Sequence, residues 1–216
     1  MKLSVMLEQL SSGMLRSMEI FFLTLIFSLP LGLLISFGRM SKNKILRTII
    51  KVYISVMRGT PLMLQLLVVY FGPYYLFGMQ IGGTYRFTAI ILGFALNYAA
   101  YFAEIYRSGI ESMPVGQYEA ARVLGYSKTQ CFCCIIFPQV VKRILPSITN
   151  EVITLVKDTS LAFTLSVAEM FSIAKALAAS KTNMIPFVAA GIFYYVFNLI
   201  VAVVMEWIEK KLDYYR

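Results

Sequence analysis

The 216-residue sequence contains no histidine, which excludes histidine general bases and histidine metal ligands. Its three cysteines, Cys131, Cys133 and Cys134, lie within four residues, and this spacing without histidine does not suit a zinc site. A Gly-x4-Gly-Lys-Ser/Thr phosphate-binding loop is also absent, so the chain shows no means of hydrolysing ATP itself. We therefore predict no catalytic site, no metal site and no bound cofactor, and we do not expect an enzyme.

Charge is scarce as well, because only 14% of the residues are charged whereas 59% are hydrophobic. Soluble domains are nearer to about 45–50% apolar. Three long runs, residues 20–37, 87–103 and 182–205, contain no charged residue. A helix needs roughly 20 such residues to cross about 30 Å of hydrocarbon. A chain of this length is too short to cover several buried apolar helices in a soluble protein, so we predict an integral membrane protein.

The hydrophobic pattern predicts an all-α, polytopic membrane protein with five transmembrane helices, and residues 1–216 form a single domain. Residues 1–17 carry apolar side chains at helical spacing, which predicts a short amphipathic helix in the membrane interface. Residues 108–143 form the longest segment between spans. The five spans are expected at residues 18–38, 60–78, 87–107, 144–171 and 184–206.

Lysine and arginine are distributed unevenly over the two sides that five spans define. One side holds 14 of the 20 basic residues and the other holds five, with Lys157 inside a span. Basic residues accumulate on the cytoplasmic side of membrane proteins, so we predict an outside N-terminus and a cytoplasmic C-terminus. Orientation in the bilayer also explains the net charge of +9 better than binding to nucleic acid does.

The segment Ser108–Arg143 is predicted to form an ordered cytoplasmic protrusion. A helix is expected to start over Glu119–Leu124, with Glu119 near the positive end of the helix dipole, and Gly125 can end that helix. A second helix is expected from Ser127, a suitable N-cap, until Pro138 restarts the chain. Two short helices at a sharp angle can fit a cleft on a soluble partner, although composition alone suits an ordinary connecting loop equally well.

One stretch of this segment, "EAARVLGYSKTQCFCCIIFP", resembles the EAA motif of ABC-importer permeases, Glu-Ala-Ala-x3-Gly-x9-Ile-x-Leu-Pro. Phe137 stands where leucine is usual, which is an apolar exchange. In that family the motif docks into a groove on the ATPase subunit. The resemblance therefore implies a coupling role for the six matching residues, which are Glu119, Ala120, Ala121, Gly125, Ile135 and Pro138.

Three further stretches look like the polar amino acid branch of these permeases: "MRGTPLMLQL" at 57–66, "ALNYAAYFAEIYRSGI" at 95–110 and "VKDTSLAFTLSVAEM" at 156–170. The resemblance implies the type I ABC importer permease fold in the bacterial plasma membrane. It also implies a second permease copy or a related chain, two ATPase subunits that bind the ATP, and an extracellular amino-acid-binding protein. A permease for an opine, a sulfur compound or an organic cation stays open, as does a membrane sensor or scaffold that transports nothing.

Ionisable residues inside a span are costly and usually face the bundle interior or a water-filled cavity. The fourth span carries a run of polar side chains: Glu151, Thr154, Lys157, Asp158, Thr159 and Ser160. Glu151, Thr154 and Asp158 stand at i, i+3 and i+7, so they share one helical face. The two hydroxyl residues at the end of the run favour a local break in the helix, where transporters expose helix ends to a substrate.

The second and third spans add four polar residues, Gln65, Asn97, Tyr101 and Glu104. We predict that these faces converge on a substrate pathway. Asp158 or Glu151 is expected to hold an α-ammonium group or a basic side chain, and Lys157 or a helix end the α-carboxylate. The alternative is an ion-pair network that holds the bundle together, and the two interpretations overlap. Arg58–Pro61 suits a tight helix start as well as it suits a gate.

Overall fold

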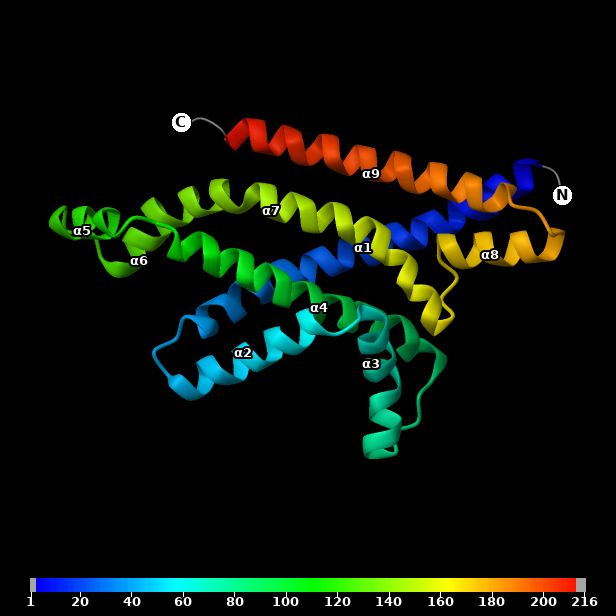
Figure 1. Cartoon of the computed structure of the whole chain (residues 1–216), viewed down its shortest axis with the longest axis horizontal. Coiled ribbons are helices and arrows are strands. Elements are labelled where there is room, and N and C mark those ends of the chain that lie inside the picture. The colour runs from blue at the N-terminus through cyan, green and yellow to red at the C-terminus, as the bar shows by residue number, and fades with distance from the viewer. Residues whose placement is uncertain (1–2, 213–216) are drawn as a thin grey trace.

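The structure, a computed structural model, describes residues 3–212 except for the side chain of Lys181. The first two residues of the predicted interfacial helix and the last four of the chain lie outside the described residues. The described range is helical and contains no strand (Figure 1). Its elements are α1 (Leu3–Arg39), α2 (Lys44–Gly59), α3 (Leu62–Phe77), α4 (Gly83–Glu111), α5 (Val115–Val123), α6 (Lys128–Gln130), η1 (Cys131–Ile136), α7 (Phe137–Asp158), η2 (Thr159–Leu165), α8 (Met170–Lys181) and α9 (Ile185–Leu212).

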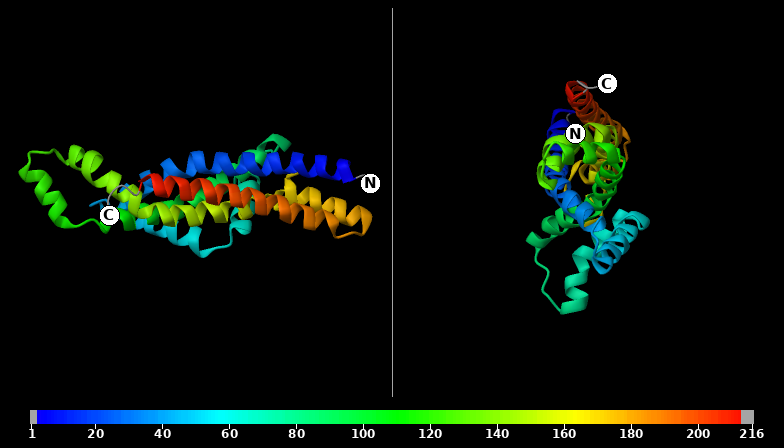
Figure 2. Two further views of the ribbon diagram at one scale, coloured as in Figure 1. Left: turned by 90° about the horizontal axis from the view of Figure 1, so that it is seen from above. Right: turned by 90° about the vertical axis from the view of Figure 1, so that its left-hand side faces the viewer.

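The long helices α1, α4, α7 and α9 lie side by side along the longest axis of the molecule (Figures 1 and 2). Helix α5 and helix α6 project from one end of this bundle, while α8 and the start of α1 lie at the other end. Within residues 3–212, four helical segments are long and apolar enough to cross a membrane, and the bent pair α2–α3 makes a fifth candidate. The prediction of an all-α membrane fold with five spans is therefore confirmed in outline.

Small residues let α4 approach its neighbours closely. A Cβ atom at Gly32 of α1 would lie 2.8 Å from the Cβ atom of Phe102 and 3.1 Å from the carbonyl oxygen of Ala99. A Cβ atom at Gly109 would collide with Ile144 of α7. Close backbone approach is how membrane helices gain packing energy, because lipid tails give no hydrophobic drive between helices. These contacts fix α4 at the centre of the bundle.

The separate interfacial helix predicted for residues 1–17 is wrong. Residues 3–17 are the first turns of α1, which continues without interruption to Arg39. Met6, Leu10 and Met14 are buried, because this part of α1 packs against α8. Gly13 permits the contact, since a Cβ atom there would lie 2.9 Å from the Cα atom of Met170. The apolar side chains do recur at helical spacing, but the face that they form packs against α8 and not against the membrane interface.

The second predicted span, residues 60–78, is also incomplete. Helix α3 has 16 residues and is about 24 Å long, which is short of the hydrocarbon thickness. The chain bends by 115° between α2 and α3, next to Pro61, which cannot donate a helical hydrogen bond. Helix α2, in a stretch that the sequence assigns to a connecting segment, packs on α1 and α4 instead.

The fourth span starts earlier and ends earlier than residues 144–171. Helix α7 follows α6 through the π-helical turn η1, and Pro138 lies in its first turn, so this proline does not restart the chain. The helix ends at Asp158, where η2 begins. The hydroxyl groups of Thr159 and Ser160 donate to the carbonyls of Val156 and Lys157 at 2.8 Å each. This is the local break that these two residues predict.

Candidate functional site

The α5–α6 loop is shaped by the left-handed backbone of Gly125, which has φ +80°. The N–H of Gly125 donates to the carbonyl of Arg122 at 3.0 Å, and the N–H of Tyr126 donates to that of Ala121 at 3.0 Å. This pair of bonds is a Schellman motif, and it ends α5 where the sequence predicts. Ser127 then caps α6 in a capping box with Gln130.

Two side-chain contacts hold this loop rigidly on the bundle. Gln117 of α5 and Gln139 of α7 exchange amide hydrogen bonds of 2.9 and 2.7 Å. Arg143 of α7 donates to the carbonyl and the hydroxyl of Ser112, which follows α4, at 2.7 and 2.9 Å. A load applied to α5 therefore reaches α4 and α7 directly. Sequence reasoning missed these polar pairs, because their partners are 22 and 31 positions apart.

The six predicted coupling residues lie along this loop, with a mixture of buried and exposed positions. Ala121 is buried and Ile135 is half-buried, so both position the loop; the other four, Glu119, Ala120, Gly125 and Pro138, are exposed. Helix α5 begins four residues before Glu119, so this carboxylate lies one turn further from the dipole end than expected. Partial burial raises the pKa of the nearby Tyr118 phenol. Exposed Val123 and Leu124 leave an apolar tip.

A charged cleft of about 440 Å³ lies between α2, α4 and α7. Its lining residues include Arg58, Tyr101, Glu104, Arg107, Ser108, Ser112, Arg143, Ser147 and Glu151. The guanidinium of Arg58 sits 5.1 Å from the centre of the Tyr101 ring. Glu104 pairs with Arg107 at 2.6 Å and with Arg39 at 3.7 Å. Three of the predicted pathway residues, Tyr101, Glu104 and Glu151, thus line one cleft.

Two charges of opposite sign in the cleft, Arg58 and Glu151, are in no direct ion pair. Among the described residues, neither Arg58 nor Glu151 forms a salt bridge or a side-chain hydrogen bond. They come from different helices and line the same space. A guanidinium and a carboxylate that line one cleft without bonding directly to each other suit a ligand with an anionic and a cationic group. From the sequence, Arg58 was predicted only to belong to a helix start or a gate, and not to line a ligand site.

The other predicted pathway residues do not line this cleft. Gln65 and Asn97 bond to each other at 2.9 Å, and both donate to the carbonyl of Met57, at 2.9 and 3.0 Å. Gln65 also donates to the carbonyl and hydroxyl of Thr60. They are buried and their side-chain nitrogens are occupied, so they fasten the bend between α2 and α3 to α4. This pair therefore has a structural role, although it acts through neutral amide hydrogen bonds and not through the ion pairs of the alternative interpretation.

The end of α7 forms a separate polar group next to the cleft. Asp158 accepts a 2.7 Å hydrogen bond from the hydroxyl of Tyr98, which is buried in α4. Thr154 donates to the carbonyl of Asn150, and Lys157 is exposed. The predicted face of α7 therefore places Glu151 in the cleft and fixes Asp158 against α4. Tyr98 was not predicted, because nothing in its local sequence separates it from the other aromatic residues.

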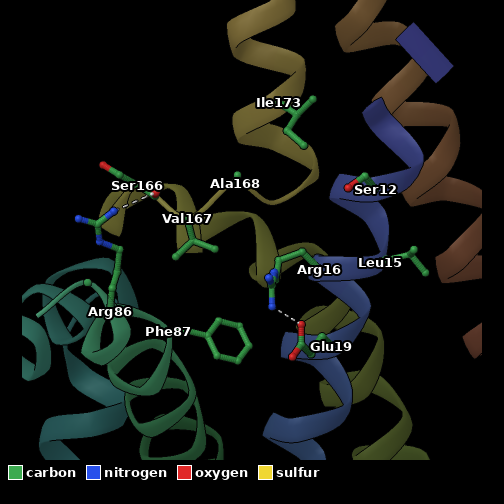
Figure 3. A pocket seen from close by; sticks show the side chains of 11 residues that line it. Ser12, Leu15, Arg16, Glu19, Arg86, Phe87, Ser166, Val167, Ala168 and Ile173 are labelled. Carbon is green, nitrogen blue, oxygen red and sulfur yellow. Dashed lines mark hydrogen bonds and ion pairs between the residues drawn. The ribbon is translucent and has the colours of Figure 1, made fainter. Parts of the chain in front are cut away.

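A larger cavity of about 720 Å³ opens at the opposite end of α4 (Figure 3). Arg16 forms an ion pair with Glu19 and lies 5.1 Å from the centre of the Phe87 ring. Arg86 reaches across to the carbonyl of Ser166 at 3.5 Å. Helix α4 thus has a cavity at each end, while Phe94 and Tyr98 between them are fully buried.

Behind this cavity, the buried carboxylate of Glu169 caps α8. It accepts from the backbone N–H groups of Phe171 and Ser172 at 2.7 and 2.6 Å, and from the hydroxyl of Tyr194 at 3.2 Å. The carboxylate thereby accepts from backbone N–H groups that the first turn of α8 leaves unpaired, and these donors and the helix dipole stabilise its negative charge. Glu169 therefore anchors α8 to α9 instead of facing a ligand.

Residues 28–214 match the family described as "Binding-protein-dependent transport system inner membrane component". The match covers well over half of the 216 residues. The chain belongs to this family. The resemblance to ABC-importer permeases that the EAA-like stretch predicts is therefore confirmed, and so is the permease fold.

Two named relatives and one solved structure match nearly the whole chain. The L-cystine transport system permease protein TcyB of Bacillus subtilis (strain 168) is 34% identical over 95% of this chain and 87% of its own length. The arginine transport system permease protein ArtQ of the same organism is 36% identical over 93% of this chain and 90% of its own. The crystal structure of an amino acid ABC transporter with histidines superimposes with a TM-score of 0.84 at 32% identity, covering 94% of each chain.

Proposed function

We propose that this inner membrane component is the membrane-spanning permease subunit of an ATP-driven importer of polar amino acids. Relatives named for cystine and arginine transport, and a solved amino acid transporter, support this substrate class. One observation of the structure carries the proposal. The rigid α5–α6 loop is bonded to α4 and α7, the two helices that line the charged cleft.

This connection gives a route from an external motor to the cleft. ATP binding and hydrolysis take place in a separate ATPase homodimer, which holds the exposed part of the α5–α6 loop. A load on α5 passes through the Gln117–Gln139 pair and the Arg143–Ser112 bonds to the helices around the cleft. Because α4 carries a cavity at each end, a tilt of α4 against α7 opens one cavity as it closes the other.

The assembly that this mechanism requires contains further chains. A second permease copy or a related chain completes the membrane unit, and an extracellular binding protein delivers the amino acid to the α8 end. The α5–α6 end faces the cytoplasm of the bacterial cell, since the basic residues gather there. The N-terminus is then outside and the C-terminus inside.

Within the cleft, the charges of Arg58 and Glu151 suit the backbone of an amino acid. Arg58 holds the α-carboxylate, which matches the planar guanidinium, and Glu151 holds the α-ammonium group. Asp158, held by Tyr98, lies further along α7 and adds negative charge on the path to the opposite cavity. Lys157 is exposed, so Arg58 replaces it as the carboxylate-binding candidate.

The test is ATP-driven uptake by the full complex in proteoliposomes, with its binding protein outside and ATP inside. A panel of labelled amino acids, used singly and in competition, identifies the substrate. Glu151→Gln is expected to reduce kcat/KM for the preferred substrate by about tenfold or more, since it removes a charge-assisted contact. Glu206→Gln, an exposed charge on α9 outside the cleft, is the matched control and leaves uptake unchanged.

The proposal is wrong if ATP and binding protein together drive no uptake of any amino acid. Uptake that is equally fast in Glu151→Gln and in the parent would leave the transport function intact but remove Glu151 from the substrate path.

A further inference from the structure

Helix α2 presents three different faces. Ile50, Tyr53, Ile54 and Met57 pack on α1 and α4. Ile45, Ile49, Val52 and Val56, at steps of three or four, form an exposed apolar stripe. A third face carries Lys44, Arg47, Lys51 and Arg58, with Ser55 completing the steps of three and four. We call these four cations the basic stripe.

The basic stripe reaches the middle of the membrane. The hydroxyl of Tyr53 donates to the carbonyl of Leu96 at 2.6 Å, and the side chain of Asn97 donates to the carbonyl of Met57. Leu96 and Asn97 lie near the centre of the uncharged run 87–103 of α4. The other end of α2 lies beside Gly38, near the end of α1. The stripe therefore runs about 21 Å from the membrane surface to mid-depth.

Such a stripe cannot face lipid. A lysine or arginine costs about 2.5–3.5 kcal/mol at the centre of a membrane-spanning helix. The sequence has no acidic residue between Glu19 and Glu104, so α2 contains none. Among the described residues, no carboxylate forms a salt bridge with Lys44, Arg47 or Lys51. Water, or an anion dissolved in it, is the remaining partner for these charges.

The inner end of the basic stripe joins the charged cleft, because Arg58 lines both. Helix α7, which lines the cleft with Arg58, also carries a polar and exposed face: Arg143, Ser147, Asn150 and Thr154 follow one another at helical steps. Toward the α5–α6 end, Arg58 is followed by Lys51 about two helical turns away, and then by Arg47 and Lys44 at about one turn each. The two polar faces run in the same direction along the bundle.

We propose that the basic stripe of α2 lines a water-filled passage from the charged cleft to the cytoplasm, and that it conducts the carboxylate of the departing ligand. The ligand class is a zwitterion or organic anion with an accessible carboxylate. Successive cations lower the cost of leaving Arg58, since the carboxylate exchanges one guanidinium or ammonium partner for the next. The identity of the ligand rests on the proposed function, but the aqueous, anion-attracting passage does not.

Thiol labelling in the reconstituted complex tests this passage. The parent carries Cys131→Ala, Cys133→Ser and Cys134→Ser, and its uptake is measured first. Ser55→Cys lies within the basic stripe, and Val56→Cys, its neighbour, lies in the apolar stripe. Each variant is treated from the cytoplasmic side with two membrane-impermeant methanethiosulfonates of similar size, the anionic sulfonatoethyl and the cationic trimethylammonioethyl reagent.

We expect Ser55→Cys to react and Val56→Cys to remain unlabelled. Relative to their reaction with free cysteine, the anionic reagent should label Ser55→Cys about tenfold faster than the cationic one, because a cleft with charge of one sign concentrates its counter-ion. Adding Arg47→Gln and Lys51→Gln should remove most of that preference. Thr48→Cys, exposed beside the stripe, serves as a second reporter if Ser55→Cys does not assemble.

Equal rates for the two reagents, or labelling of Val56→Cys in place of Ser55→Cys, would overturn the passage. So would a preference that survives Arg47→Gln with Lys51→Gln. Labelling does not depend on transport, so failure of the parent to take up amino acids would count against the proposed function alone.

Discussion

At the scale of single residues, the ends of helices decide how the loop and α8 are held. Gly125 and Ser127 could be predicted from sequence, because a left-handed turn and an N-cap are local and depend on the residue type. The capping role of Glu169 was not predicted, because glutamate is not among the residues that N-caps prefer, and its second contact, with Tyr194, comes from another helix. The position of Glu119 was misjudged because α5 begins immediately after Pro114.

Gly125→Ala should loosen the α5–α6 loop. A Cβ atom at this φ costs about 1–2 kcal/mol, although no atom crowds the site. This corresponds to about five- to thirtyfold faster hydrogen exchange of the α5 amides that the motif protects. Gly116→Ala in the first turn of α5, where nothing lies within 4 Å of an added Cβ atom, is the control and should not speed exchange. Equal exchange in Gly125→Ala and the parent would contradict the role of this turn.

Glu169→Ala should release the start of α8. The substitution leaves the N–H groups of Phe171 and Ser172 without an acceptor, and loss of an N-cap costs about 0.5–2 kcal/mol. Mass-spectrometric hydrogen exchange over α8 should rise by about tenfold. Tyr194→Phe keeps both backbone bonds and should change this rate far less. A larger effect from Tyr194→Phe than from Glu169→Ala would show that the cap is not what orders α8.

At the scale of helices, long apolar runs were easy to predict and their bends were not. The spans in α1, α4 and α9 follow from uncharged stretches, because hydropathy alone requires a helix there. The course of α2 was missed because its basic residues look like a connecting segment. Its packing depends on contacts such as that of Met57 with Asn97, which are 40 positions apart. The charged cleft was missed in part for the same reason.

Asn97→Leu should weaken the bend between α2 and α3. It leaves the side-chain oxygen of Gln65 without its Asn97 donor, and an unsatisfied buried polar group costs about 1–3 kcal/mol. The melting temperature of the purified complex should fall by several degrees. Asn198→Leu in α9 is a matched control, because the side-chain oxygen of Asn198 is buried and has no hydrogen-bond partner among the described residues. A fall of the same size in both variants would contradict a specific role for the Asn97 bonds.

Gly109→Ala should separate α4 from α7. The added methyl group would collide with Ile144, and overpacking of this kind costs about 1–3 kcal/mol. We expect a lower melting temperature of the complex and slower ATP-driven uptake, because these two helices join the loop to the cleft. Gly191→Ala in α9, where nothing lies within 4 Å, should leave both unchanged. Normal uptake by Gly109→Ala would argue against a rigid α4–α7 unit.

At the scale of the whole molecule, a helical bundle with a cavity at each end of α4 is joined to one rigid protrusion. The fold class could be predicted because composition permits few solutions for a chain so apolar and so short. Which residues line each cavity could not be predicted. The cleft residues come from three helices, and Asp158 bonds to Tyr98 and does not line the cleft. In this arrangement the α5–α6 loop can move the bundle only if another chain binds to the loop.

The most direct measurement identifies what contacts the tip of α5 in the working complex. Val123, 88% exposed, is replaced by p-benzoylphenylalanine and irradiated in cells, and the cross-linked peptides are identified by mass spectrometry. We predict an adduct with a nucleotide-hydrolysing subunit, formed only when that subunit is present. An adduct with an extracellular binding protein, or none in a complex that still transports, would contradict a force-transmitting role for the α5–α6 loop.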